Sequence, residues 1–181
     1  MADHPLIVFA SAGSPVPLVA LRDVLVNEGY PANFGIEIAG AANEEELNTA
    51  EWDATFLRWL TPETHEVALI DCSICGQDEE AERLIGLHLT RIVDLKDVAG
   101  KMIVAEQLNK TRTVYTVELM PALLADENHD GWGCLDVLLR FIAQAADGLI
   151  YAEAEGYCDA DGELMLAETD ELFPVDMAEL D

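Results

Sequence analysis

The order of the apolar segments constrains the fold of this chain more than any motif does. Segments with the period-two pattern of strands mix with segments of helical period, without a regular alternation of the two. The last two strand segments, 149–158 and 163–167, flank the turn Asp159-Ala-Asp-Gly162, which is typical of a β-hairpin. This order predicts a single-domain α+β fold in which helices pack on one mixed, mostly antiparallel sheet. The alternative is a thioredoxin-like or doubly wound α/β sheet.

Strand segments outside the hairpin are recognised by their continuous or alternating apolar residues. The clearest are short and apolar, and the last is rich in Thr, Val and Tyr, which favour strands. They are residues 5–10, 34–38, 66–71, 101–105 and 112–118.

Helical periodicity predicts four helices. The first takes Ser14 as its N-cap, with Pro15 at the first helical position, and ends at Gly29. The second opens at 43–46, which resembles a capping box. Its buried face would consist of Trp52, Phe56, Trp59 and Leu60. The third is capped by Asp78, and the last covers 135–146.

The length and composition indicate one globular domain over residues 1–181, with an acidic C-terminal tail at about 168–181. The chain is 51% hydrophobic, yet it has no apolar run of the roughly 18 residues that a membrane span requires. Its first five residues lack the basic region of a secretory signal, so we expect a cytoplasmic protein. Four scattered cysteines in a reducing compartment would remain thiols.

Charge is the least ordinary feature of the composition. There are 36 acidic residues against 9 basic ones, which gives a net charge of -27. Nucleic acids and anionic lipids are bound through Lys and Arg, so we expect neither direct nucleic-acid binding nor membrane binding. The segment 91–112 is an exception, because it holds five bases and three acids. The last fifteen residues hold six acids and no base.

The pair Cys72-Ser-Ile-Cys75 lies between a predicted strand and a predicted helix. That is the place at which dithiol exchangers of the thioredoxin type keep their reactive pair, because a helix N-terminus stabilises a thiolate. Zinc is the second interpretation, with further ligands drawn from Cys134, Cys158, His88 or His129. A structural zinc site normally has two close pairs of ligands, and here only one pair is close. Two buried thiols without chemistry are the plainer interpretation.

The segment Asp126-Glu-Asn-His-Asp-Gly131 matches the opening half of a calcium-binding loop. Asp126, Asn128 and Asp130 would supply oxygen ligands at positions one, three and five, with glycine at position six. The second half does not match, because Val137 stands where the bidentate acid belongs. The alternative is a polar loop whose acids favour the N-terminus of the following helix.

The remaining candidates for chemistry are few. His88 interrupts an apolar helix face, which suggests either a general base or, as we favour, a hydrogen-bonded core histidine. The chain has no phosphate-binding loop, nucleophile elbow, zinc-protease motif or dinucleotide fingerprint. We therefore lean against an enzyme, and we expect no cofactor unless calcium or zinc binds at the residues named above.

The charge supports one function above the others, namely an interaction domain that docks a basic protein partner, in the manner of immunity proteins or nucleic-acid mimics. Asp170, Glu171 and Asp176 in the acidic tail are the predicted contacts. The alternative is a metal-binding or small-molecule-binding domain, or an enzyme, whose acidity reflects solubility or adaptation to salt. Self-association through an exposed apolar patch also remains open.

Overall fold

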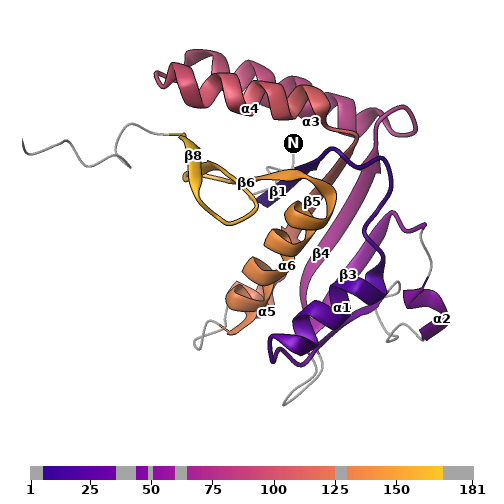
Figure 1. The fold of residues 1–181 in the computed structure, drawn as a ribbon. Coiled ribbons are helices and arrows are strands. Elements are labelled where there is room, and N and C mark those ends of the chain that lie inside the picture. The colour runs from indigo at the N-terminus through magenta and orange to yellow at the C-terminus, as the bar shows by residue number, and fades with distance from the viewer. Residues whose placement is uncertain (1–5, 36–43, 49–50, 60–64, 125–129, 169–181) are drawn as a thin grey trace, which may run out of the picture.

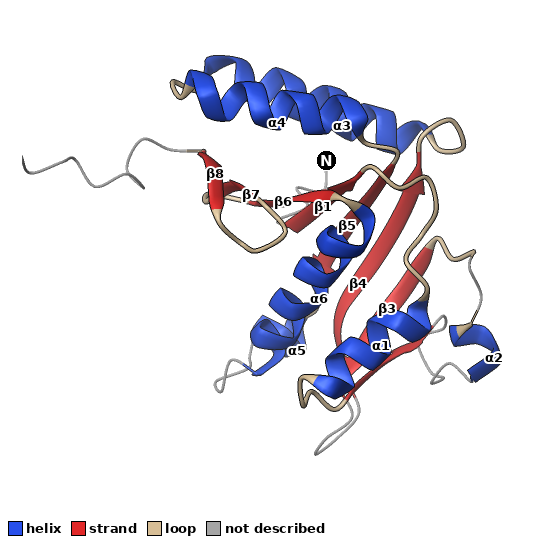
Figure 2. Cartoon of the chain, viewed as in Figure 1, coloured by secondary structure: helices blue, strands red, loops and turns tan. Residues whose placement is uncertain are grey.

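One antiparallel sheet of eight strands runs through the molecule, in the order β2-β3-β4-β5-β1-β6-β7-β8 (Figures 1 and 2). The computed structural model describes residues 6–35, 44–48, 51–59, 65–124 and 130–168. The strands are β1 (Leu6–Ala10), β2 (Ala32–Gly35), β3 (Ala54–Trp59), β4 (His65–Ile74), β5 (Thr113–Leu119), β6 (Gly148–Ala152), β7 (Gly156–Cys158) and β8 (Leu164–Ala167). All seven neighbouring pairs are antiparallel. The predicted α+β class is confirmed, and the doubly wound alternative is not observed.

The first strand of the chain is central in the sheet. It pairs with β5 on one side and with β6 on the other, so that Leu6 faces both Val117 and Ala152. Its side chains alternate between the two faces of the sheet, as the strand period requires. Ile7 and Phe9 enter one buried cluster, and Val8 and Ala10 enter the other.

Helices cover both faces of this sheet (Figure 2). On one face lie α3 (Glu79–Arg91) and α4 (Val98–Lys110), joined by a short 3-10 turn at Ile92–Asp94. On the other face lie α1 (Leu18–Asn27) and α6 (Asp130–Ala146), with the short helices α2 (Glu44–Leu47) and α5 (Pro121–Leu124) at the periphery (Figure 1). No helix in the described ranges is both long and apolar enough to cross a bilayer.

The longest helix, α6, shows why the sequence supports this arrangement. Apolar residues recur at three-to-four-residue spacing along it and are buried against β1, β6 and α1. Leu138 and Ile142 have no solvent exposure, and each such side chain stabilises the fold by about 1.5–3 kcal/mol on burial. The helix predicted over 135–146 is confirmed, and it begins earlier, at Asp130.

Two of the sequence predictions are wrong about element type. Residues 54–59 form strand β3, whereas the aromatic spacing had indicated a helix running through Trp52, Phe56, Trp59 and Leu60. The helix that opens near residue 43 is confined to α2, and Leu60 lies outside the described residues. The predicted strand 101–105 belongs instead to α4, whose N-cap Asp97 accepts a hydrogen bond from the amide of Gly100 at 3.1 Å.

Other predictions were right in type and wrong in their boundaries. Helix α1 begins at Leu18, directly after Pro17, and not at Pro15, and its buried face consists of Leu18, Leu21 and Leu25. The predicted strand 149–158 is two strands, because the chain turns at Ala154, which has a positive φ of 68°. The hairpin around 159–162 is confirmed as β7 and β8.

Candidate functional site

A cavity of about 740 Å³ opens beside the carboxyl ends of β1 and β4. These two strands run parallel to each other, because β5 lies between them and pairs antiparallel with both. The cavity also borders the segment before β3 and the N-terminus of α3. It is lined by Gly13, Ser14, Pro15, Glu51, Trp52, Asp53, Cys72, Ile74, Gln77 and Asp78. Its volume falls in the range of small-ligand sites, which is roughly 300–1,000 Å³.

One wall of the cavity is a loop held by two buried aromatic side chains. The indole nitrogen of Trp52 donates a hydrogen bond to the carbonyl oxygen of Val16 at 2.9 Å. The amide of Val16 in turn donates to the hydroxyl of Tyr115 on β5 at 3.0 Å. The Trp52 and Tyr115 rings pack at a centroid distance of 5.9 Å. The loop after β1 is therefore fixed by the core, although it has no regular secondary structure.

The opposite wall is fixed by backbone contacts between two strands and by the cap of a helix. The Cys72 amide donates to the Asp53 carbonyl oxygen at 2.7 Å, which joins the start of β3 to the end of β4. Asp78 caps α3, accepting from the Glu80 amide at 2.9 Å and from the Ser73 hydroxyl at 2.8 Å. As predicted, Asp78 opens this helix.

The ionisable side chains of the cavity are acidic, apart from one thiol. Among the described residues, three carboxylates line it, those of Glu51, Asp53 and Asp78, and no Lys or Arg does. The Glu80 amide, and then the Ser73 hydroxyl, lower the pKa of Asp78, so this carboxylate stays charged at neutral pH. The N-terminus of α3 is already occupied by Asp78, and Glu82 accepts from the Gly76 amide at 3.2 Å. This geometry suits a cation or a hydrogen-bond donor and disfavours a phosphate.

The structure places Cys72 and Cys75 on opposite sides of the sheet. Cys72 is buried in the cluster beneath α1 and α6, whereas Cys75 packs against the cluster beneath α3 and α4. An odd spacing on an extended chain separates two side chains in this way. The other two cysteines lie apart, Cys134 within α6 and Cys158 on β7. Within the described ranges, no three His, Cys, Asp or Glu side chains are grouped to hold a metal ion.

Burial makes these thiols poor nucleophiles. Desolvation raises the pKa of Cys72 to about 12. The hydrogen bond with the Tyr115 hydroxyl lowers this pKa, but its effect is smaller than that of desolvation. Desolvation also raises the pKa of Cys134 to about 12. The pKa values of Cys75 and Cys158 are raised as well, again chiefly by desolvation, although both are only partly buried. All four are therefore thiols at neutral pH.

We predict a clear order of alkylation for the native protein with iodoacetamide at pH 8. Cys75 and Cys158 should react first, and Cys72 and Cys134 should react only as the chain unfolds, because a pKa near 12 lowers the thiolate fraction about a thousandfold relative to an ordinary thiol. Timed quenching and peptide mass spectrometry would measure the order. Rapid modification of Cys72 in the native protein would contradict the prediction and revive the dithiol hypothesis.

Several predicted site residues lie outside the part of the chain that the structure describes. Asp126 and Asn128 of the calcium half-loop fall in the range 125–129, and Asp130 is the first residue of α6. Asp170, Glu171 and Asp176 of the acidic tail fall in the range 169–181. The calcium and tail hypotheses stay predictions.

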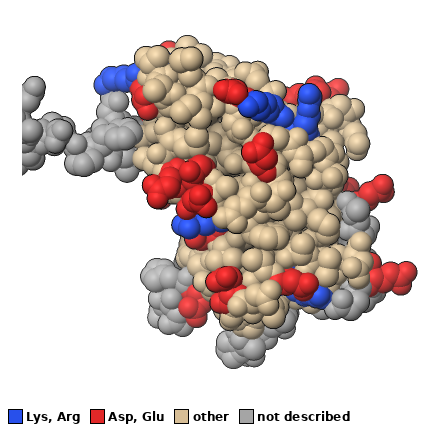
Figure 3. All heavy atoms as spheres, viewed as in Figure 1, with Lys and Arg blue, Asp and Glu red and all other residues tan. Residues whose placement is uncertain are grey.

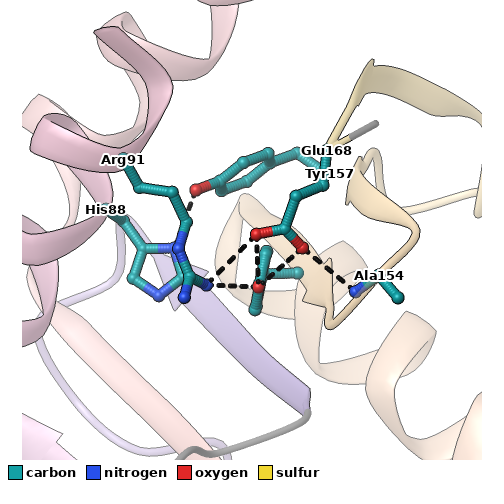
Figure 4. Close-up of polar contacts among 6 residues, drawn as sticks. His88, Arg91, Ala154, Tyr157 and Glu168 are labelled. Carbon is teal, nitrogen blue, oxygen red and sulfur yellow. Dashed lines mark hydrogen bonds and ion pairs between the residues drawn. The ribbon is translucent and has the colours of Figure 1, made fainter. Parts of the chain in front are cut away.

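His88 belongs to a buried polar network between α3 and the last three strands (Figure 4). Its Nδ1 shares a hydrogen bond with the Tyr157 hydroxyl at 2.8 Å, and its ring packs against Phe9, Tyr151 and Tyr157. Desolvation, followed by the nearby Arg91 charge, lowers the pKa of His88 to about 4. His88 is thus a neutral, hydrogen-bonded core residue at physiological pH, as we favoured from the sequence.

Arg91, Tyr151 and Glu168 form the second half of this network. The Arg91 guanidinium donates to the Tyr151 hydroxyl and pairs with Glu168 at 3.5 Å. The Tyr151 hydroxyl lies 3.0 Å from Glu168 Oε2, which also accepts from the Ala154 amide at 3.0 Å (Figure 4). Glu168 therefore fixes the positive-φ turn between β6 and β7, and the network is structural. No sequence motif predicts this network, because its residues come from three segments that are far apart in the sequence.

Sequence reasoning did not bring the cavity residues together as a site, although it named Cys72 for redox or zinc chemistry and Asp78 as a helix cap. Trp52 was correctly expected in the core, but as part of a helix. Nothing in the sequence marked Glu51, Asp53 and Gln77 as site residues, apart from their positions next to the ends of strands or helices. Comparisons of this chain with protein-family models, with curated proteins and with solved structures found no match.

Proposed function

We propose that this protein is an interaction domain that docks a basic protein partner, and that a Lys or Arg side chain of the partner enters the cavity beside Trp52. The observation that carries the proposal is the cavity itself, whose charged lining consists of three carboxylates. A long basic side chain has an apolar stem and a cationic head. The stem would pack on Trp52 and Ile74, and the head would lie beside the acidic side chains.

The charge of the whole molecule supports the same function. A net charge of -27 attracts a cationic protein from a distance and raises its association rate. Acidic side chains are spread over the face shown in Figure 3, with basic ones between them. The electrostatic field of the negative charge attracts the partner to the surface. The cavity then provides a specific contact, which long-range attraction alone does not provide. The acidic tail remains a second proposed contact through Asp170, Glu171 and Asp176.

Two double variants separate the cavity from the general field. Glu51→Gln/Asp53→Asn neutralises two exposed carboxylates at the cavity, and Glu153→Gln/Glu155→Gln neutralises two exposed carboxylates in the β6–β7 turn. Both variants change the net charge by the same amount. We expect the cavity variant to bind the partner about tenfold more weakly, because two charge-assisted contacts of about 1 kcal/mol or less each are lost. The control variant should bind nearly as the wild type does.

The partner is first captured from host lysate at low salt, eluted with rising salt, purified and titrated calorimetrically against each protein. Support requires one basic protein, lost as salt rises, whose dissociation constant rises only for the cavity variant. Equal weakening by both variants would remove the cavity from the proposal. Capture of no basic protein, or binding that does not respond to salt, would overturn the docking function.

A further inference from the structure

Helix α4 carries an exposed apolar patch on the side that faces away from the sheet. Its inner face is buried through Val104 and Leu108. Its outer face presents Val98, Met102 and Ile103, which are 66%, 71% and 51% exposed. Val98 and Met102 are one turn apart, as are the exposed Ala99 and Ile103, so these residues form one patch near the start of the helix. A helix that is apolar on both sides normally has a second partner.

The segment that contains this α4 patch has a small excess of bases, unlike the rest of the chain, and at the start of the helix Lys96 and Lys101 lie beside Asp94 and Asp97. The segment 91–112 holds five bases against three acids. Lys101 lies within α4, and its ammonium donates to the Val93 carbonyl oxygen at 3.0 Å. Val93 itself is 65% exposed and extends the apolar surface towards α3. Wide areas without Lys, Arg, Asp or Glu lie over α3 and α4 at the top of Figure 3, with both basic and acidic side chains at their margins.

The C-terminal segment departs from a point that is anchored to the same helical layer. Strand β8 packs directly against α4, since a Cβ built on Gly100 would lie 2.5 Å from the Met165 carbonyl oxygen. Glu168, which follows β8, is held by Arg91 of α3 at 3.5 Å and by the Ala154 amide. Residue 169 therefore follows a fixed position beside α3 and α4.

The sequence of residues 169–181 is complementary to the α4 patch. It contains five acids and no base, and its large apolar side chains are Leu172, Phe173, Val175, Met177 and Leu180. Thirteen residues reach roughly 43 Å when extended, whereas a helix of the length of α4 spans roughly 20 Å. The segment is thus long enough to lie along the whole helix.

We infer that residues 169–181 bind the outer face of α4, with their apolar side chains on Val98, Met102 and Ile103 and their carboxylates beside Lys96 and Lys101. The inference is independent of the proposed function. It also bears on that function, because a tail bound to α4 is withheld from a basic partner, so the two would compete for the same carboxylates.

The tethered segment is favoured over a second copy of the chain for two reasons. Attachment at Glu168 gives the segment an effective concentration in the millimolar range, at which even a weak contact is populated. A second copy would bring its own net charge of -27 against the first, and this repulsion opposes self-association.

Methionine methyl NMR tests the contact directly, since the chain has five methionines, one of them Met102 on the patch. Residues 1–181 are compared with residues 1–168, a truncation that keeps every described element and Glu168. We expect the Met102 resonance to move on truncation and the Met120 resonance, next to β5, to stay. An unchanged Met102 resonance would overturn the inference. So would a Met102 shift that appears only as protein concentration rises, because that result would assign the patch to a second copy.

A peptide of residues 169–181, labelled with a fluorophore and titrated against residues 1–168, provides the second measurement. We expect saturable binding that Val98→Glu weakens by at least about tenfold, because the substitution removes an apolar contact and adds a like charge. Val26→Glu on α1 is the matched control, since Val26 is also exposed, at 56%, and it should change the affinity by less than about twofold. No binding, or equal loss in both variants, would contradict the inference.

Discussion

Gly156→Ala should destabilise the protein by about 3–5 kcal/mol, a large part of the stability of a domain of this size. Gly156 opens β7 at φ +122°, a backbone conformation that residues with a Cβ rarely adopt. A Cβ at this position would overlap the Leu166 carbonyl oxygen and lie 2.8 Å from the Glu168 amide nitrogen. Both atoms belong to the backbone next to β7, so they cannot move aside without breaking the β7–β8 pairing. Equilibrium unfolding in urea, followed by circular dichroism, would measure the loss.

Gly76→Ala separates the clash from the backbone strain. Gly76 also has a positive φ, +81°, but a Cβ there would meet no atom within 4 Å. We expect this control to cost only about 1–2 kcal/mol, which is the strain of a left-handed conformation without the clash. Equal losses in the two variants would show that the close approach at Gly156 does not contribute.

The stability of the wild-type protein should fall by about 3 kcal/mol more than that of His88→Gln between pH 7 and pH 4. Burial holds the pKa of His88 at about 4 in the folded protein, whereas in the unfolded chain the pKa is 6.5. Between these values the unfolded chain binds a proton that the folded protein does not bind. Stability contributed by neutral His88 is therefore complete above pH 6.5 and is lost as the pH falls towards 4.

Subtracting the two pH profiles removes the effect of carboxylates that both proteins share. The groups around His88 are Arg91 on α3 and the two tyrosines, Tyr151 and Tyr157, with Glu168 beyond them. Urea unfolding at half-unit pH intervals would give the profiles. Parallel profiles for wild type and His88→Gln would mean that His88 titrates normally in the folded protein, and so that the burial of its ring is not maintained in solution.

The sequence predicted helices and strands best where the spacing of the apolar side chains agrees with the capping or turn residues at the ends of the segment. Asp78 is followed by a clean apolar face, so the third helix was placed correctly at its N-terminus. The Asp and Gly residues of the 159–162 turn identified the last hairpin, because few other structures use that combination. These local agreements were enough to establish the α+β class.

The errors arose where tertiary packing overrides local pattern. Trp52, Phe56 and Trp59 have helical spacing, yet β2 and β4 lie on either side of this segment and satisfy its backbone as a strand. Residues 101–105 are apolar and β-branched in part, but Asp97 caps a helix through them. Neither outcome could be read from a short window, because both depend on neighbours far along the chain.

The candidate site was even less accessible to sequence reasoning. The cavity is assembled from the ends of β1 and β4, the segment before β3 and the turn before α3, and no sequence motif links these segments. Of its residues only Cys72 was singled out for chemistry, and that was redox or zinc chemistry, which the separation from Cys75 does not favour. A site defined by convergence of loops becomes visible only when the sheet order is known.

The central position of β1 has a consequence for the way in which the chain must fold during its synthesis. Leu6 emerges first but finds its partners only at Val117 and Ala152. At typical rates of translation the second partner follows on the order of ten seconds later. Both edges of β1 lack a partner until β5 has been made, and one edge still lacks a partner until β6 follows, so the two halves of the sheet cannot join before then. Electrostatic repulsion between such nascent, highly acidic chains would help to keep them from aggregating before β1 is paired.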